Sequence, residues 1–309
     1  MEIIRDINSV DKYPVAATIG SFDGVHCGHK AMIEETRRRA AALGLPVTLV
    51  TFSMHPRMLF DCDPQPFLLS SGEMRLQRLA DTGVERCVVL DFDRNMAAMT
   101  AREFMGKVLA ERLGVKLLVL GYDHRFGRPE PGVDADTYVA IGRELGIEVV
   151  RASRYNVDGD KVSSSQIRRA LTAGDVQCAA KLLGYNYSIS GVVVHGAALG
   201  RELGFPTANI EIDEPMQLLP ANGVYEVMAS VNGARFRGVI NVGVKPTISG
   251  CGCRTVELFI IDFSGDIYGC NVEVAFLRRL REERRFASLD ELKAQIVKDV
   301  ASVASNMNK

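Results

Sequence analysis

The stretch Val15-Ala-Ala-Thr-Ile19, followed by Gly20-Ser-Phe-Asp-Gly-Val-His-Cys-Gly-His29, decides the fold of the first half of the chain. Val15–Ile19 is a short apolar run with β-branched residues, which is typical of a buried strand. After the glycine-containing loop, Lys30–Leu43 has the composition of a helix, and Gly44 stands where a helix-ending glycine is expected. A buried strand, a loop and a helix in this order indicate the start of an α/β domain.

The alternation of strand and helix continues through the first half of the chain. We expect strands at Val47–Phe52, Cys87–Leu90, Leu117–Leu120 and Ile147–Val150, and helices at Gly72–Ala80, Arg102–Leu113 and Asp136–Leu145. Strands that alternate with helices form a parallel sheet with helices on both faces, so a Rossmann-like α/β domain is predicted. Ligands of such sheets bind at the carboxyl ends of the strands, here the loops that follow the predicted strands.

The second half changes character near Gly184–Ser188. Short strands follow one another without intervening helices, at Tyr187–Val194, Val224–Val231, Phe236–Val242, Thr255–Asp262 and Val272–Phe276. This pattern predicts an antiparallel β-barrel or sandwich. One terminal helix is expected over Leu289–Ser302, with Ser288 as its N-cap. We therefore predict two domains, residues 1–184 and residues 185–309.

Composition narrows the function classes. Lys plus Arg number 37 and Asp plus Glu 38, so the net charge of −1 argues against a protein built to bind nucleic acid or an anionic membrane. No apolar run approaches the roughly 18 residues of a membrane span, and the charged start does not resemble a signal peptide. We expect a cytoplasmic protein whose partners are small molecules, with a monomer favoured.

The cysteines do not indicate a metal or disulfide framework. There are 7, scattered except for Cys251-Gly-Cys253, and no Cys-x-x-Cys pair occurs. This usage fits a reducing compartment and gives a structural zinc site little support. We interpret Cys251 and Cys253 as free thiols rather than a redox pair.

The loop Gly20–His29 carries the densest chemistry of the first half. It enters a helix, whose N-terminus presents free N–H groups to phosphate, and His26 and His29 can donate further hydrogen bonds. The sequence contains no Gly-x-x-x-x-Gly-Lys-Ser/Thr loop, which argues against a P-loop enzyme. Two alternatives stay open: polar residues that only start a helix, and a metal site through His26, Cys27 and His29.

Four segments of the first half, in order, resemble the bacterial bifunctional riboflavin kinase/FAD synthetase family. Gly20–His29 resembles its phosphate-binding signature. The other three are Thr51-Phe-Ser-Met-His-Pro56, Gly121-Tyr-Asp-His-Arg-Phe-Gly127 and Ser163-Ser-Ser-Gln-Ile-Arg168. The last departs from the family's Ser-Ser-Thr-x-Ile-Arg pattern at Ser165, which keeps the hydroxyl of threonine.

The resemblance implies a nucleotidyltransferase domain that makes FAD from FMN and ATP. The residues it assigns to catalysis are His26, His29, Ser164 and Arg168. Those it assigns to ATP binding are Gly20, Phe22, Asp23, Gly24, Gly28, Ser163 and Ser165. Those it assigns to flavin binding are His55, Pro56, Asp123 and Phe126. Taken alone, the serines could be a plain helix cap, Asp123 a turn residue and His55 a loop residue.

The strongest motif of the second half is Gly200-Arg-Glu-Leu-Gly-Phe-Pro-Thr-Ala-Asn209. Thr207 and Asn209 present neutral oxygen ligands, which suit Mg²⁺ bound together with nucleotide phosphates. The segment resembles the riboflavin kinase signature of the same family, and Gly238–Thr247 matches the Asn-x-Gly-x-x-Pro-Thr segment that follows it. The resemblance implies Mg²⁺ at Thr207 and Asn209, and ATP binding by Gly200, Gly204, Pro206, Thr207 and Asn209.

Glu257 is the odd charge in an otherwise apolar strand. The resemblance makes it the base that accepts the proton of the riboflavin 5′-hydroxyl, whereas the residue alone reads as a solvent-facing strand position. The charge run Arg278–Phe286 reads as a solvated helix or loop face. By resemblance, Arg281 and Phe286 lie near the flavin of the kinase.

The motif order implies a bifunctional enzyme that makes FMN in the C-terminal barrel and FAD in the N-terminal domain. The expected cofactor is Mg²⁺, with riboflavin, FMN, FAD and ATP as substrates and products. Two other hypotheses stay open: an enzyme with only one active domain, and a flavin- or nucleotide-binding regulator without turnover. A nucleic-acid-binding barrel is disfavoured by the balanced charge.

Overall fold

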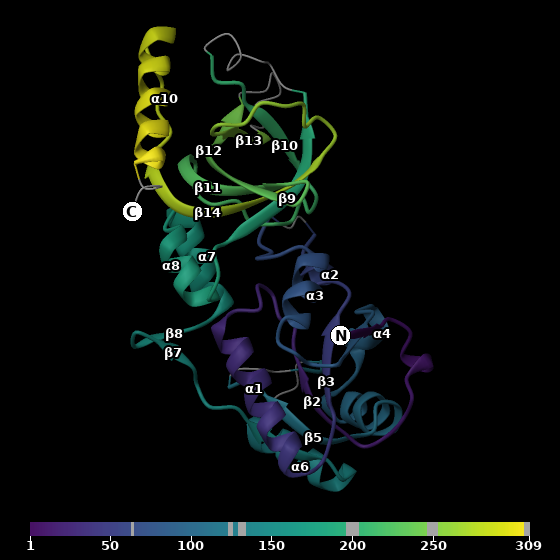
Figure 1. Ribbon diagram of the computed structural model, residues 1–309. Helices are drawn as coiled ribbons and strands as arrows, with labels where there is room; N and C mark the ends of the chain where they lie inside the picture. The colour runs from purple at the N-terminus through teal and green to yellow at the C-terminus, as the bar shows by residue number, and fades with distance from the viewer. Residues whose placement is uncertain (63–64, 123–125, 129–133, 196–203, 246–252, 306–309) are drawn as a thin grey trace. The chain divides into compact units, whose positions relative to one another are not determined.

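The computed structural model describes residues 1–62, 65–122, 126–128, 134–195, 204–245 and 253–305 (Figure 1). The chain forms two compact units, Met1–Pro64 with Gly72–Ser163, and Gln65–Ser71 with Ser164–Lys309. The second unit therefore begins well before the predicted domain boundary at Gly184.

The helices α7 (Ser164–Ala173) and α8 (Val176–Leu183) belong to the second unit because they pack against its strands. The amide of Ala221 donates to the Leu171 carbonyl at 2.9 Å, and Gly174 lies against the side chain of Arg279. The assignment of one activity to residues 1–184 and the other to residues 185–309 stays a prediction.

The first unit is built on a six-stranded parallel sheet, as the alternating pattern predicts. Its strands are β1 (Glu2–Ile4), β2 (Val15–Ile19), β3 (Val47–Phe52), β4 (Arg86–Leu90), β5 (Val115–Leu120) and β6 (Glu148–Arg151), in the spatial order β1-β4-β3-β2-β5-β6. Strand residues alternate between two cores. Ala16 packs with α1 (Cys27–Ala42) and α3 (Gly72–Ala80) on one face, and Ala17 with η2 (Phe104–Arg112) and α6 (Ala135–Leu145) on the other.

The strand order reverses at β2. The chain runs from β2 through β3 to β4 in one direction, and β5 and β6 lie on the other side of β2. Ligands of open α/β sheets bind at such a switch point, outside the carboxyl ends of the strands. The loops after β2 and β5 are therefore neighbours at the edge where a ligand is expected.

Several short elements of the first unit were not predicted. They are η1 (Ile7–Ser9), α2 (Arg57–Phe60), α4 (Arg94–Ala98) and the small hairpin β7 (Asn156–Val157) and β8 (Asp160–Lys161). The helix expected at Arg102–Leu113 is a short α5 (Ala101–Glu103) that continues as the π-helix η2, in which the Leu113 amide donates five residues back, to the Val108 carbonyl, at 3.1 Å.

The second unit contains a closed antiparallel barrel, which settles the barrel-or-sandwich alternative. The strands are β9 (Ser188–Val194), β10 (Ala208–Ile212), β11 (Gly223–Val231), β12 (Ala234–Lys245), β13 (Cys253–Ile260) and β14 (Asn271–Arg281). They pair in the order β10-β13-β12-β11-β14-β9 and close between β9 and β10. β10 was not predicted as a strand. β14 runs to Arg281, so the interpretation of Arg278–Arg281 as a solvated helix or loop face is wrong.

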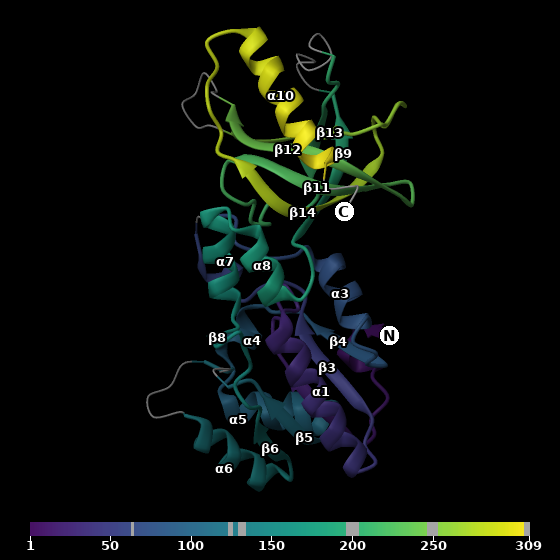
Figure 2. The ribbon, with the colours of Figure 1, turned by 60° about the vertical axis from the view of Figure 1, so that its left-hand side comes forward.

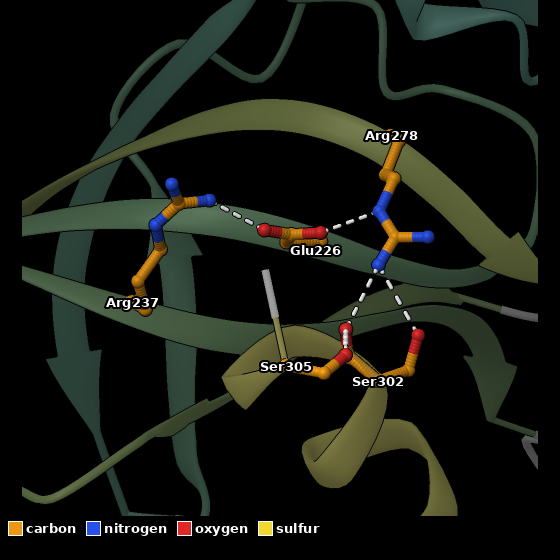
Figure 3. A network of polar contacts seen from close by, with 5 residues as sticks. All are labelled: Glu226, Arg237, Arg278, Ser302 and Ser305. Carbon is orange, nitrogen blue, oxygen red and sulfur yellow. Dashed lines mark hydrogen bonds and ion pairs between the residues drawn. The ribbon is translucent and has the colours of Figure 1, made fainter. Parts of the chain in front are cut away.

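The terminal helix α10 (Leu289–Ala304) lies along the outside of the barrel in both views (Figures 1 and 2). Ser288 caps it as predicted, accepting a hydrogen bond from the Glu291 amide at 3.2 Å. Arg278 of β14 connects the barrel to this helix, because its Nη2 donates to the Ser302 carbonyl and hydroxyl, each at 3.1 Å (Figure 3). Arg278 also pairs with Glu226, which is 3% exposed and pairs with Arg237 as well. These partners explain why the arginines of β14 remain in a strand.

Candidate active sites

The loop between β2 and α1 has a strained backbone. Phe22 and Val25 have φ values of +48° and +38°, and Gly24 between them has +78°. Positive φ is rare for residues with a side chain, and most unusual for a β-branched one. Phe22 and Val25 are fully buried, so their packing offsets the strain. The loop is thereby held in a turn that leads directly into the start of α1.

His26 and His29 are brought together at the N-terminus of α1. His26 is the N-cap, and its Nδ1 accepts a hydrogen bond from the His29 amide at 3.2 Å. The two rings stack with centroids 3.6 Å apart, and the Phe22 ring meets His29 edge-on. Because Nδ1 of His26 accepts, the neutral ring carries its proton on Nε2 and can donate from there.

Gly28 makes this stack possible. A Cβ atom at Gly28 would lie 3.2 Å from the His26 ring, which is tighter than most packed contacts. The predicted ATP-binding residues Gly20, Phe22, Asp23 and Gly24 lie in the loop between β2 and α1, and Gly28 is the second residue of α1. The loop lies at the strand switch point, where ligands of open α/β sheets bind, and its role in phosphate binding stays a prediction.

Arg75 on α3 was missed by the sequence analysis. Its guanidinium is buried and donates to the carbonyls of Ser21, at 3.1 Å, and Phe52, at 2.6 Å. Burial lowers the pKa of Arg75, while the negative charge of Asp23 acts in the opposite direction. Arg75 thus ties the loop after β2 to the end of β3. Its one sequence signal is its position beside Leu76 and Leu79 on the apolar side of α3.

The predicted flavin contacts of the first unit are only partly described. His55 follows β3, and its Nδ1 accepts from the Arg57 amide at 3.2 Å, while Pro56 stands at the N-cap of α2. Phe126 packs between the rings of Phe104 and Tyr138, so it also has a core role. Asp123 lies outside the described residues.

The serine segment starts α7. Ser163 is the last residue of the first compact unit, and Ser164 and Ser165 are the first residues of α7 in the second. One turn later, Arg168 donates from Nε to the Phe67 carbonyl at 2.7 Å, and its guanidinium lies over the Phe67 ring.

The barrel brings Asn209 and Glu257 together. They are direct cross-strand partners between β10 and β13, and Asn241 on β12 is the partner of Glu257 on its other side. Glu257 is half-buried, whereas its neighbours Val256 and Leu258 are buried in the barrel interior, so Glu257 faces the outside. Cross-strand partners have Cβ atoms about 4.5–5.5 Å apart, which places a carboxamide on each side of the carboxylate.

A cavity of about 450 Å³ is lined by the residues next to Asn209 and Glu257 in sequence, Ala208 of β10 and Leu258 of β13. Its lining includes Pro206, Thr207 and Ala208, at the start of β10, and the loop from Phe263 to Tyr268 after β13. The ring of Tyr268 stacks on His195 with centroids 3.7 Å apart. Gly204 has a φ of +83°, and Gly200 lies outside the described residues. The cavity is the candidate nucleotide pocket of the barrel.

Two family descriptions match the chain: FAD synthetase over residues 9–166 and riboflavin kinase over residues 183–307. The bifunctional riboflavin kinase/FMN adenylyltransferase of Pseudomonas fluorescens is 39% identical over 308 residues, which cover 98% of this chain and 96% of the relative. The chain belongs to the bifunctional riboflavin kinase/FMN adenylyltransferase family. The family, the fold class and the presence of both enzyme domains are therefore confirmed as predicted.

Further members of this family show the same extent of likeness. The Escherichia coli K12 enzyme is 38% identical over 303 residues, and the Haemophilus influenzae enzyme is 38% identical over 311 residues that cover 100% of both chains. A solved structure from Streptococcus pneumoniae, described as a macrolide-efflux protein, has a TM-score of 0.87 at 31% identity and covers 98% of both chains. In the part of our chain that the structure describes, no helix is long and apolar enough to cross a membrane.

The two residues predicted to lie near the flavin of the kinase, Arg281 and Phe286, contact other residues of the second unit. Arg281 pairs with the buried Asp299 of α10 at 3.0 Å, and Arg281 and Arg284 both lie against the Phe286 ring. Arg281 therefore ties the end of β14 to α10, and the contact of Arg281 and Phe286 with flavin stays a prediction.

Among the described residues, no three His, Cys, Asp or Glu side chains gather as a metal-binding group, which leaves the alternative of a metal site at His26, Cys27 and His29 without support. Thr207, which lines the cavity, and Asn209, the cross-strand partner of Glu257, offer neutral oxygens, a set that suits Mg²⁺ carried by nucleotide phosphates. Of the Cys251–Cys253 pair, Cys251 lies outside the described residues and Cys253 begins β13.

Proposed function

We propose that the barrel phosphorylates riboflavin to FMN and that the N-terminal domain transfers AMP from ATP to FMN, giving FAD and pyrophosphate. The register of β10, β13 and β12 carries the kinase assignment, because it aligns Asn209 with Glu257, and Thr207, two residues before Asn209, lines a cavity of nucleotide size. The histidine stack at the strained loop supports the adenylyltransferase assignment.

In the kinase step, Glu257 accepts the proton of the riboflavin 5′-hydroxyl as that oxygen attacks the γ-phosphorus of ATP. The bond from the γ-phosphorus to the bridging oxygen breaks, and ADP leaves. Thr207 and Asn209 would hold Mg²⁺, which would neutralise charge on the phosphates when bound. The enzyme's contribution is mainly positioning and charge stabilisation.

In the adenylyltransferase step, a phosphate oxygen of FMN attacks the α-phosphorus of ATP and pyrophosphate leaves. The FMN phosphate is already an anion, so the step needs no strong base. His26, His29 and the N-terminal amides of α1 would stabilise charge on the phosphates. The family resemblance assigns Ser164 and Arg168 to the same step.

The test is chromatography of the purified protein with riboflavin, ATP and MgCl₂, sampled over time. We expect FMN first and FAD later, and no product when EDTA replaces MgCl₂. If FMN forms but FAD does not, even when FMN is supplied directly, only the kinase domain would be active. Neither product would favour the flavin-binding regulator.

A further inference from the structure

Glu257 has a carboxamide on each side. The kinase motif gives a role to Asn209 but not to Asn241. Asn209 on β10 and Asn241 on β12 are both its direct cross-strand partners. Both are half-buried, and neither side chain has a hydrogen bond to another residue that the structure describes. Half-buried amides beside a carboxylate are suited to binding a substrate that reaches it.

The surroundings of the two carboxamides differ. The lining of the cavity includes Val193 of β9, Thr207 before Asn209 and the loop after β13, but no residue of β12, so the cavity lies toward the Asn209 end of the row. On the Asn241 side, the chain after β14 crosses the barrel: a Cβ atom at Gly243 would collide with the Glu283 carboxylate and lie 3.2 Å from Nδ2 of Asn241. Glu283 is held there by Asn222, whose Nδ2 donates to it at 3.3 Å.

Phosphoryl transfer requires the acceptor oxygen and the donor phosphate to meet at the base, roughly in line. If the nucleotide occupies the cavity, the rest of the acceptor must extend from Glu257 in the other direction. Glu283 stands between Arg281 and Phe286 in sequence, so the segment that the resemblance assigns to flavin reaches the barrel on the Asn241 side.

We propose that Asn241 binds the polyhydroxylated side chain of riboflavin through a secondary hydroxyl and so aligns the 5′-hydroxyl over Glu257. This role rests on the proposed kinase function. It divides the row into a nucleotide-side amide, Asn209, and an acceptor-side amide, Asn241.

The experiment compares Asn241→Ala and Asn209→Ala in steady-state assays of ADP formation. We expect Asn241→Ala to raise the KM for riboflavin about tenfold, the effect of one lost hydrogen bond, with the KM for ATP within about twofold of the wild type. Asn209→Ala should give the opposite pattern. Asn271→Ala, an exposed position at the start of β14, is the matched control and should change neither constant.

A second measurement separates binding from a structural effect. The flavin analogue with an ω-hydroxypentyl chain keeps the terminal hydroxyl and lacks the secondary hydroxyls. With this acceptor, wild type and Asn241→Ala should have equal KM values, whereas a distorted barrel would keep the difference.

FAD formation from supplied FMN should be unchanged in each variant and reports on folding of the remainder of the chain. An Asn241→Ala enzyme with an unchanged KM for riboflavin, or with the larger change in the KM for ATP, would overturn the proposal. A wild-type protein that makes no FMN would overturn the kinase function itself, and this inference with it.

Discussion

In the first unit the residues of the candidate site follow one another in sequence, whereas in the barrel they come from three separate strands. The loop Gly20–His29 keeps its shape through positive φ values and buried side chains. The row of Asn209, Glu257 and Asn241 exists only because β10, β13 and β12 pair in one register. The loop site should therefore respond to local changes, and the barrel site to any change that moves a strand.

The largest effect that separates the two sites is expected from Glu257→Gln. The variant keeps the shape of the side chain and removes the proton acceptor, so FMN formation should fall by about 10²–10⁴-fold. FAD formation from supplied FMN should not change. Glu211→Gln, an exposed carboxylate of β10, is the matched control and should be silent. Equal turnover of Glu257→Gln and wild type would remove the assigned role.

His29→Ala tests the loop site in the opposite sense. We expect FAD formation from FMN to fall about 100-fold, because a donor to charged phosphate is lost, while FMN formation is unchanged. Arg38→Ala, exposed on the same helix, serves as the control. A comparable loss of both activities would contradict two separate sites.

Glu226→Gln tests whether the barrel site depends on distant strands. Glu226 is 3% exposed and joins the arginines of β12 and β14, so the variant should lower the free energy of unfolding of the barrel by about 2–3 kcal/mol. Calorimetry with kinase and adenylyltransferase assays on the same sample measures this. Glu273→Gln, an exposed residue of β14, should change stability by less than about 0.5 kcal/mol. Loss of FAD formation before FMN formation on heating the variant would contradict the assignment.

Arg75→Met gives the smallest expected effect. It tests whether the shape of the loop Gly20–His29 depends on a residue outside that loop. Removing the guanidinium leaves the carbonyls of Ser21 and Phe52 without these donors, at a cost of about 1–3 kcal/mol. The loop should be held less well, and the KM for ATP in FAD formation should rise about threefold to tenfold while FMN formation is unchanged. Arg38→Met, at an exposed position of α1, is the control. An unchanged KM would show that the loop keeps its shape without Arg75.

The same contrast explains which parts of the structure could be predicted. Val47–Phe52 and Gly72–Ala80 form the predicted elements with the predicted bounds, because a short apolar run and an amphipathic repeat are local signals. β10 was missed because its five residues overlap a motif that was interpreted as a ligand loop, although Ala208, Ile210 and Ile212 alternate as a strand does.

Long-range partners account for the other differences. Arg278 and Arg281 are charged residues in a strand, and the charges that make this possible, Glu226 and Asp299, stand far from them in sequence. The burial of Arg75 could not be predicted for the same reason, because its acceptors are two backbone carbonyls, which no pattern of side chains indicates. The alignment of Asn209 and Asn241 with Glu257 could be predicted only in part, because the register between two strands depends on both strands and not on one segment of sequence.

The parallel sheet and the barrel also differ in whether they have edge strands that could pair with another molecule during synthesis and purification. Every strand of the barrel has a neighbour on both sides, whereas the parallel sheet ends in β1 and β6. Unpaired edges are where strands of different molecules join and aggregate, and proteins protect them with short, charged edge strands. β1 has three residues and begins with Glu2, and β6 has four, of which Glu148 is the first and Arg151 the last. Replacing these charges with apolar residues should therefore reduce the yield of soluble protein through self-association of the first unit, while the barrel has no comparable edge.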